Sequence, residues 1–535
     1  MNTGSFLIQS YLLKFNQTKT IGAMKFKVPY LVLFFTSVLM SSLSLQAQNV
    51  VEQIQVIPGE LPDPSIIEVD GTYYATGTSG DWAPIYPIYT STDLKNWELL
   101  SHVFLDLPDW AMSSFWAPEL YFKDGTFFCY YTARAKDGIS KIGVATTKDI
   151  SQGFQDKGVI IEWGNEAIDA FVYEHQNSLY ITWKAYGLEP SKPVTLLGSK
   201  LSDDGLSLIG KEFVTITADD NEFEGNMIEG QCIVEKGGYL YMIYSGNGCC
   251  GPQCNYQVGV ARAKNMKGPW EKAPENPLIV GNSSWKCPGH GTVIYTKNKW
   301  YYLYHAYNSK GFPSLGRAAI FSEMYWDENN GWPYFKVNEE TSEKDRLVKN
   351  LIDNFEQPQL NNFWRKNLLS TDFDIELVNG ELELTETHPD SKNKTGAALC
   401  VIPDDSDFEF SIKVKNTNQA LKGLVFYTTK DKSLGLGIQG NELLLWKVTD
   451  GNFEVMESTQ LKNAQNIALK AKVSDSNKID FSYQEADGNW KSFNTLQGNN
   501  LTWWSSGMKI GIQIKKDIAT GAADGRFDDF MIQYK

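Results

Sequence analysis

The stretch at residues 61–78, LPDPSIIEVDGTYYATGT, decides the fold, because four related stretches follow it along the chain. They are WAPELYFKDGTFFCYYTA (116–133), IDAFVYEHQNSLYITWKA (168–185), IEGQCIVEKGGYLYMIYSG (228–246) and GHGTVIYTKNKWYYLYHAY (289–307). In each, an aromatic-rich run follows a turn. A repeat of roughly 50 to 60 residues is typical of blade-type architectures, so the pattern predicts a β-propeller with five blades.

One position of the repeat carries ionisable side chains. We take Tyr73, Phe127, Leu179, Tyr239 and Trp300 as equivalent anchors after the turns. Asp63, Asp169, Glu229 and His290 each stand ten residues before their anchor, and Glu119 stands eight before its own. A blade begins with its innermost strand, which lines the central channel. We therefore expect a pocket rich in carboxylates, and carboxylate pairs are the groups that cleave glycosidic bonds.

Composition narrows the class of ligand. The chain has 535 residues, which is enough for at least two domains. Its formal net charge of −15 counts against nucleic acid as a partner, because nucleic-acid binding relies on basic patches. With 16 Trp and 26 Tyr, the chain suits a neutral sugar, whose apolar faces stack on aromatic rings.

The N-terminal region has the features of a signal peptide, predicted over residues 1–47. A short basic start at residues 24–27 precedes an apolar core at residues 28–39, and small residues lead to a cleavage site after Ala47. Met24 is an alternative start. No cysteine near the cleavage site offers a lipid anchor, and no later stretch is long enough for a membrane span. We expect a periplasmic or secreted protein.

Seven cysteines fit an exported protein. Four of them cluster in sequence: Cys249, Cys250, Cys254 and Cys287. Their spacing does not match the paired ligands of a zinc site, so we expect one or two disulfides there, with the pairing left open. Cys129 and Cys232 stand inside apolar runs and are predicted to be core residues.

The chain divides into two all-β parts. Residues 50–340 show short aromatic or β-branched runs between turns, as expected of the propeller. A charged segment near residue 340 is predicted to be a linker. Residues 351–535 show closely spaced alternating strands, which predict a jelly-roll-like β-sandwich whose last strand pairs near Asp353.

The runs LPDPSII, FWAPEL, IDAFVY, IEGQCIVEKGGYLYMIYSG, GHGTV and YHAY resemble glycoside hydrolase family 43 over about residues 56–340. The resemblance implies a five-bladed propeller that hydrolyses glycosides with inversion. It implies that Asp63 is the general base, Asp169 modulates the pKa of the acid, and Glu229 is the general acid. His290 matches a position near a central calcium or water, and Arg317 matches an arginine near the substrate.

Further candidates come from residues around these positions. Trp82, Phe115 and Trp116 are candidates for stacking on a sugar, with core packing as the alternative. Gln231 stands where the family commonly has a proline. Glu119 is interpreted as a structural residue or a hydrogen-bond acceptor. A structural Ca²⁺ is considered at the propeller centre, where His290 could contact it through water, or in the sandwich at Asp524 and Asp528.

The leading functional hypothesis is an exo-acting enzyme that removes terminal α-L-arabinofuranose from plant polysaccharides or oligosaccharides. A β-xylosidase or an exo-β-galactosidase on the same scaffold stays open. A retaining fructosidase fits less well, because proline precedes Asp63 and no Arg-Asp-Pro run occurs. A non-catalytic carbohydrate-binding propeller is the alternative of a different class. The oligomeric state is left open.

Overall fold

The computed structural model describes residues 53–309, 315–336, 348–388, 392–474, 477–497 and 507–534. The predicted signal peptide lies outside these residues. Almost all regular structure is β-strand, and the one helix described is a short 3-10 turn, η1 (Ile150–Gln152). Within the described ranges, no helix has the length and apolar character needed to cross a membrane.

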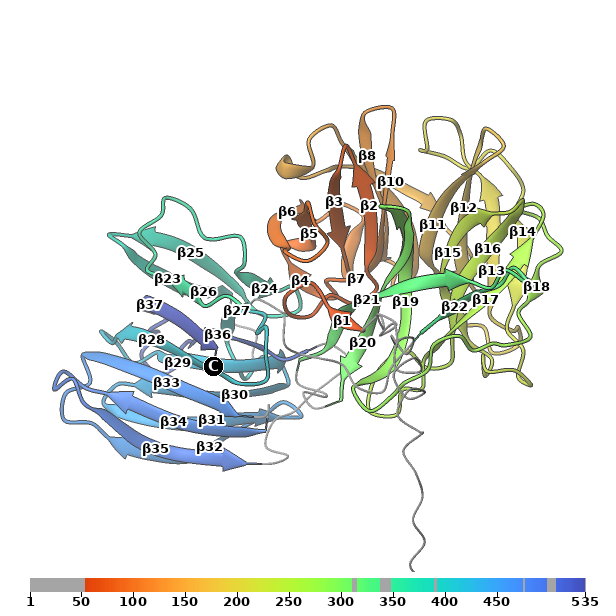
Figure 1. The fold of residues 1–535 in the computed structure, drawn as a ribbon. Coiled ribbons are helices and arrows are strands. Elements are labelled where there is room, and N and C mark those ends of the chain that lie inside the picture. The colour runs from red at the N-terminus through yellow and green to blue at the C-terminus, as the bar shows by residue number, and fades with distance from the viewer. Residues whose placement is uncertain are drawn as a thin grey trace, which may run out of the picture. The chain divides into compact units, whose positions relative to one another are not determined.

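Apart from β4 (Trp82–Ala83), the strands described between residues 53 and 336 form five antiparallel sheets, which are the five predicted blades (Figure 1). Blade 1 consists of β2 (Ser65–Val69), β3 (Thr72–Thr76), β5 (Ile85–Ser91) and β6 (Glu98–Phe104). Blade 2 consists of β7 (Ala111–Lys123), β8 (Thr126–Ala135), β9 (Ser140–Thr147) and β10 (Gln155–Ile161). Blade 3 consists of β11 (Ala167–His175), β12 (Ser178–Ala185), β13 (Thr195–Lys200) and β14 (Phe213–Thr217).

Blade 4 consists of β15 (Ile228–Lys236), β16 (Tyr239–Gly246), β17 (Gln257–Ala263) and β18 (Glu271–Lys272). Blade 5 consists of β19 (Trp285–Thr296), β20 (Lys299–Asn308), β21 (Arg317–Trp326) and β22 (Pro333–Phe335). The first described strand, β1 (Ile54–Gln55), pairs with β21, where Ile54 lies opposite Phe321. The N-terminal end of the propeller is therefore a strand of the last blade.

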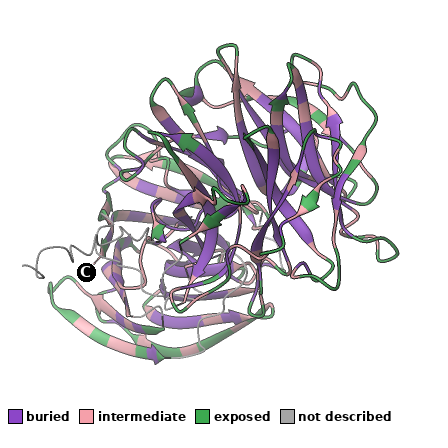
Figure 2. Ribbon diagram, turned by 45° about the vertical axis from the view of Figure 1, so that its right-hand side comes forward, coloured by how far each residue is buried: buried purple, intermediate pink, exposed green. Residues whose placement is uncertain are grey.

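Burial explains why the blade strands are nearly continuous apolar runs. Strand β16, YLYMIYSG, is buried at every position except its first, because both faces of a blade pack against neighbouring blades. Figure 2 shows buried residues along the strands and exposed residues at the turns. In contrast, β28 (Phe408–Lys415), FEFSIKVK, alternates between buried and more exposed positions, as expected of a strand with one face toward a core.

The C-terminal part consists of two large antiparallel sheets that enclose an apolar core, which confirms the predicted β-sandwich class. One sheet contains β25 (Asp372–Val378), β26 (Glu381–His388), β37 (Asp524–Tyr534), β28, β33 (Asn466–Ser474), β34 (Lys478–Gln484) and β35 (Trp490–Gln497), with β23 (Leu351–Asp353) beside β37. Asp353 lies opposite Phe530 of β37, as predicted for the last strand.

The second sandwich sheet includes a strand from the propeller. Its order is β32 (Asn452–Gln460), β31 (Glu442–Thr449), β30 (Lys432–Gln439), β29 (Leu421–Thr429), β36 (Lys509–Lys515), β27 (Ala397–Val401), β24 (Arg365–Asn367) and β4 (Trp82–Ala83). Strand β4 belongs to the loop between β3 and β5 of blade 1, and Asn367 lies opposite Trp82 (Figure 1). A buried ion pair, Lys509 with Glu60, adds a second link between the two parts.

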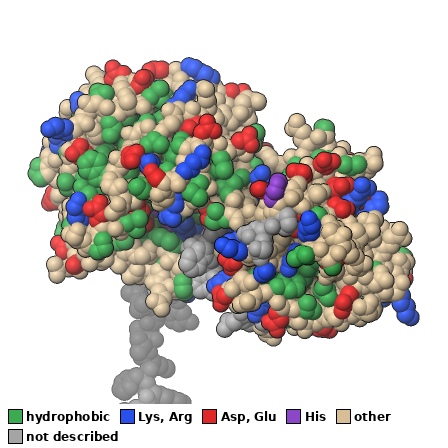
Figure 3. Space-filling view, turned by 180° about the vertical axis from the view of Figure 1, so that it is seen from behind, with side chains coloured by type: hydrophobic (Ala, Val, Ile, Leu, Met, Phe, Trp, Pro, Cys, Tyr) green, Lys and Arg blue, Asp and Glu red, His purple; other side chains and the backbone are tan. Residues whose placement is uncertain are grey.

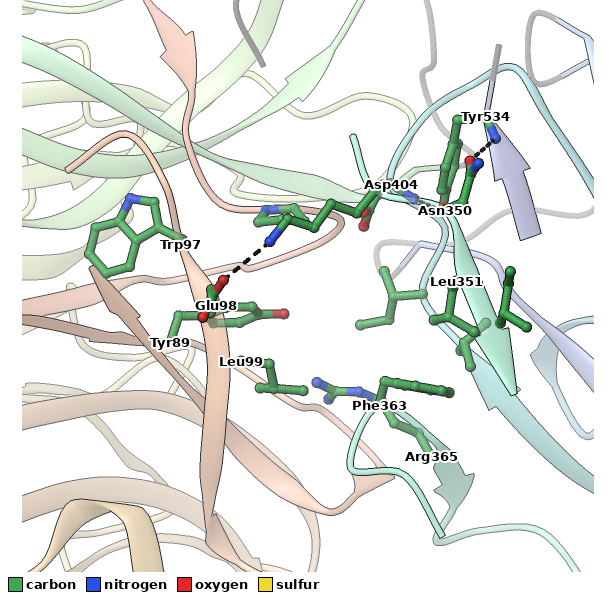
Figure 4. A pocket seen from close by; sticks show the side chains of 15 residues that line it. Tyr89, Trp97, Glu98, Leu99, Asn350, Leu351, Phe363, Arg365, Asp404 and Tyr534 are labelled. Carbon is green, nitrogen blue, oxygen red and sulfur yellow. Dashed lines mark hydrogen bonds and ion pairs between the residues drawn. The ribbon is translucent and has the colours of Figure 1, made fainter. Parts of the chain in front are cut away.

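A cavity of about 410 Å³ lies beside this junction (Figure 4). It is lined by residues of blade 1, including Tyr89 and Leu99, and by residues of the C-terminal part, including Phe363 and Arg365. Arg365 is only 4% exposed, and burial lowers its pKa. On the face drawn in Figure 3, acidic and basic side chains are interspersed.

The clustered cysteines form two disulfides. Cys254 is bonded to Cys287 across 33 residues, and Cys249 is bonded to its neighbour Cys250. Cys129, Cys232 and Cys400 are free and buried. The loop that follows β16 is therefore linked by a disulfide to β19. Its cysteines pack on two tyrosines, Tyr256 and Tyr307.

Candidate active site

The backbone is irregular at the same place in every blade, inside the innermost strand in blades 2 to 5 and just before β2 in blade 1. The backbone is left-handed, with positive φ, at Asp63, Ala117, Asp169, Gly230 and His290. In β11, for example, Ile168 pairs with Lys184 and Phe171 with Thr182, so two residues face one across a bulge. A bulge of this kind bends the strand and re-aims a side chain. We call these five residues the bulge residues.

The bulge residues differ in two blades from the residues that the sequence repeat placed at this position. Ala117 is the bulge residue of blade 2, and Glu119 lies two residues further along β7. In blade 4 the bulge residue is Gly230, and Glu229 comes one residue before it. Gly230 is required here, because a Cβ atom at this position would lie 2.6 Å from Cγ of His290.

Hydrogen bonds join each bulge to the blade before it. The N–H groups of Ala117, Asp169 and His290 donate to side-chain oxygens of Thr78 (2.7 Å), Thr132 (3.2 Å) and Ser245 (2.8 Å) in the preceding blades. The N–H of Asp63 donates to Nδ1 of His305 in blade 5 at 3.1 Å, which completes the ring. A bulge frees an N–H from the ladder, and a buried N–H needs an acceptor.

The junction between blades 3 and 4 departs from this pattern. The residue that corresponds to Thr132 and Ser245 is Lys184, which has donors but no acceptor. The N–H of Gly230 donates instead to Oδ2 of Asp169 at 3.3 Å. Gln231 also ties the two blades together, since its Nε2 donates to the carbonyl of Asp169 at 2.6 Å. Asp169 is therefore held by blade 4 as well as by blade 2.

Asp63 is surrounded by donors. Arg317 Nη1 lies 2.9 Å from Oδ1, and the hydroxyl of Thr78 donates to Oδ2 at 2.6 Å. Nδ1 of His290 lies 3.5 Å from Oδ1. Burial acts to raise the pKa of Asp63, but the charge of Arg317 and the nearby histidines outweigh it and lower that pKa well below its usual value. Asp63 is therefore a carboxylate at neutral pH.

His290 connects the predicted base to the second carboxylate. Its Nδ1 lies 3.5 Å from Asp63 and 3.8 Å from Oδ2 of Asp169. Burial, with the charges of Glu229 and Asp63 adding to it and that of His290 opposing it, raises the pKa of Asp169 to about 7. Asp169 therefore holds a proton over part of the neutral range.

Glu229 is paired with a residue that the sequence interpretation missed. Nζ of Lys184 lies 2.6 Å from Oε2 of Glu229, and both side chains are buried. Burial acts to raise the pKa of Glu229, but the charge of Lys184 outweighs it and lowers that pKa. The signal was present in the sequence, because Lys184 stands in the apolar run LYITWKA, where a lone lysine requires a partner.

Glu119 is buried close to the channel, with Ser65 and Thr292 as hydrogen-bond partners. Burial raises the pKa of Glu119 to about 8, so the group is protonated at neutral pH. Its charge acts on the buried thiol of Cys129, and it takes no part in the ring of hydrogen bonds described above. These surroundings agree with the structural role considered for it.

The structure separates the three aromatic candidates. Trp82 packs edge-on against Tyr427 of the sandwich, with ring centroids 5.3 Å apart, and is 4% exposed. Phe115 is completely buried against Tyr86. Neither ring has a free face for a sugar. Trp116 is partly exposed, and the guanidinium of Arg134 lies 5.7 Å from its ring centroid.

The calcium expectation stays a prediction. In the described part of the chain, no group of three or more His, Cys, Asp or Glu residues is arranged to hold a metal ion. Ca²⁺ prefers oxygen ligands, whereas the side chain of His290 offers nitrogen. In the sandwich, Asp524 accepts a hydrogen bond from Asn418 at 2.9 Å.

Comparisons with known proteins agree with this geometry. The model of glycosyl hydrolases family 43 matches residues 53–333. The β-xylosidase of Bacillus subtilis strain 168 is 26% identical over 318 residues, which cover 54% of this chain and 57% of that protein. The extracellular exo-α-(1→5)-L-arabinofuranosidase ArbA of Cellvibrio japonicus is 27% identical over 306 residues, 51% of this chain and 86% of that protein.

Among solved structures, the xylan β-1,4-xylosidase from Bacillus halodurans C-125 superposes with a TM-score of 0.76 at 20% identity, covering 90% of this chain and 100% of that one. This likeness shows the fold. The chain spans little more than half the length of the Bacillus subtilis relative. Since the family model covers more than half of the chain, and all five blades of the propeller are present, the chain belongs to glycosyl hydrolases family 43.

Proposed function

We propose that the protein is an inverting exo-glycosidase that removes terminal α-L-arabinofuranose from plant cell-wall polysaccharide. The observation that carries the mechanism is the convergence of Asp63, Asp169 and Glu229 from three different blades. His290 lies within 4 Å of the first two, and the charges of Asp63 and Asp169 influence the third.

Asp63 is suited to act as the general base. An inverting enzyme needs a carboxylate that accepts a proton from the attacking water. The charge of Arg317 keeps Asp63 ionised, and the contacts with Arg317, Thr78 and His290 orient it. The water would attack the anomeric carbon while Asp63 takes its proton, so the configuration at that carbon inverts.

Glu229 is suited to act as the general acid and Asp169 to support it. The acid protonates the leaving oxygen as the glycosidic bond breaks. Asp169 is near enough for its charge to raise the proton affinity of Glu229 when both are ionised. Trp116, His290 and Arg317 are the residues that we propose contact the sugar, since each is beside the carboxylates or partly exposed in blade 2.

The choice of arabinofuranose rests on relatives. ArbA, which is aligned over 86% of its own length, is named for exo-acting arabinofuranosidase activity. The Bacillus subtilis relative is named a β-xylosidase, so xylose is the second candidate. We also propose a periplasmic or secreted location, which the predicted signal peptide and the word extracellular in the name of ArbA support.

A panel of nitrophenyl glycosides tests the sugar. We expect cleavage of the α-L-arabinofuranoside, and cleavage of the β-xyloside alone would replace it with the second candidate. Proton NMR of the first product formed tests the stereochemistry, because net retention at the anomeric carbon would rule out direct displacement of the leaving group by a base-activated water. Activity on arabinan and arabinoxylan, with products identified, tests exo-action.

Substrates with different leaving groups distinguish the proposed role of Glu229 as the acid from that of Asp63 as the base. Glu229→Gln removes proton donation, so we expect turnover to fall by about 10²–10⁴-fold on a glycoside with a poor leaving group. A dinitrophenyl glycoside needs little protonation and should be much less affected. Asp63→Asn should slow both substrates similarly. Equal losses for Glu229→Gln on the two substrates would count against its role as the acid.

A further inference from the structure

The ring of hydrogen bonds has one exception, and it lies beside the proposed acid. In four blades, the residue opposite the bulge is a Thr, Ser or His that accepts the next bulge N–H. In blade 3 this residue is Lys184, and Gly230 has to find another acceptor. The change gives up a regular contact, and it places a cation in the interior of the propeller.

The positive charge of Lys184 acts on Glu229. Nζ of Lys184 lies 2.6 Å from Glu229, and the side chain of Lys184 is 7% exposed. Burial acts to lower the pKa of Lys184, but the charges of Glu229, Asp169 and Glu166 outweigh it and raise that pKa. A buried lysine with this set of neighbours stays charged. Its ammonium therefore acts continuously on the carboxyl of Glu229.

We propose that Lys184 is a positioning residue that fixes the carboxyl of Glu229 and sets the pH above which this group stops donating a proton. The inference rests on the proposed role of Glu229 as the acid. Lys184 supplies two things at once: a short hydrogen bond that orients one carboxyl oxygen, and a positive charge that favours the carboxylate over the acid form.

Other charges around Glu229 come from several elements and have to be weighed together. Asp169 lies on β11, His290 on β19, Asp63 before β2, and Glu166 just before β11. Asp63 opposes ionisation of Glu229, and His290 favours it. Glu229 in turn raises the pKa of Asp169 and of Glu166, so these carboxyls and Glu229 oppose each other's ionisation. Lys184 makes the shortest contact in this group, so its removal is expected to dominate.

The sign of the effect follows from the role of the acid. A general acid works only while protonated, so kcat/KM falls as the pH rises through its pKa in the free enzyme. Lys184 lowers that pKa. Replacing the ammonium by a neutral group should therefore move the falling limb of the kcat/KM profile to higher pH, by about one to three pH units for a contact this close.

The experiment compares pH profiles of kcat/KM for the wild type, Lys184→Met and Lys184→Thr. Lys184→Met keeps the length of the stem, and Lys184→Thr introduces the residue type that occupies this place in blades 1 and 2. Both should move the falling limb upward, while Lys184→Arg, which keeps a positive charge, should leave it near the wild-type position. If neither neutral variant that folds moves the limb, the proposal is wrong.

Lys272→Met is the matched control, because Lys272 also lies 2.6 Å from a buried glutamate, Glu224. It should lower thermal stability without moving the falling limb. The leaving-group test on Glu229→Gln checks the proposed role of Glu229 separately from that of Lys184. A loss of turnover there, together with unchanged limbs in the Lys184 variants, overturns the role of Lys184 alone.

Discussion

Arg317 Nη1 lies 2.9 Å from Oδ1 of Asp63, and the charge of Arg317 is the strongest influence that keeps this buried carboxyl ionised. We expect Arg317→Met to raise the pKa of Asp63. A general base works only when deprotonated, so the rising, acidic limb of the kcat/KM profile should move to higher pH. An acidic limb that stays in place would show that Arg317 serves sugar binding alone, and KM measurements would then reveal it.

Glu119 makes stability depend on pH. Burial raises the pKa of Glu119 from 4.5 to about 8, so between these values the folded protein binds more protons than the unfolded chain. The stabilisation is complete below about pH 4.5 and is lost as the pH rises through 8, by up to about 5 kcal/mol.

Glu119→Gln keeps the shape of the side chain and removes its titration. Thermal unfolding from pH 5 to pH 8 should therefore show a steeper fall for the wild type than for this variant. Glu174→Gln, at the surface near Lys123, is the control and should follow the wild type. Parallel curves for wild type and Glu119→Gln would contradict the assignment.

Trp82 should matter for stability and not for substrate affinity. Its ring is buried against Tyr427, and Trp82→Ala would leave a large cavity in the junction, at a cost of about 3–5 kcal/mol. Trp116→Ala is the comparison, because that ring is partly exposed and proposed to contact the sugar. We expect a lower melting temperature with unchanged KM for Trp82→Ala, and a raised KM for Trp116→Ala.

Arg365 is expected to destabilise the fold. It is buried beside the cavity in Figure 4, where burial lowers its pKa and where no carboxylate among the described residues forms an ion pair with it. Replacing a buried, unpaired charge by a hydrophobic side chain of similar length removes a desolvation cost, so Arg365→Met should raise stability by about 1–4 kcal/mol.

Thermal unfolding measures the effect, and Arg526→Met is the control. Arg526 is 39% exposed at its side chain and pairs with Glu383, so its replacement should change stability by about 1 kcal/mol or less. If Arg365→Met is less stable than the wild type, the guanidinium has a stabilising partner in solution.

The sequence predicted the blades because each one repeats a turn and an aromatic strand, and it predicted the convergence of Asp63, Asp169 and His290 because they share one repeat position. It misplaced Glu229 by one residue, because the anchor Tyr239 is the first residue of its strand, whereas the other four anchors are the second residues of theirs. The partners of a buried side chain depend on neighbouring blades, so spacing along one chain could not reveal the pairing of Lys184 with Glu229.

The aromatic candidates show a second limit. All three residues lie beside the first two repeats, so the sequence does not distinguish Trp82 and Phe115 from Trp116 as candidates for stacking on a sugar. What distinguishes Trp82 is contact with the sandwich, more than 300 residues further along the chain. No local pattern carries that information, and only the assembled junction shows which ring is free.

Strand β4 limits where the chain can be truncated. The match to the family model ends at residue 333, yet blade 1 contributes β4 as the edge of a sheet whose other strands all come after that point. A truncated enzyme ending there would leave Trp82 without its cover and Glu60 without Lys509. Exposed apolar edges promote aggregation. Anyone trimming this hydrolase to a minimal catalyst would therefore have to redesign that seam and could not simply cut the gene at the boundary.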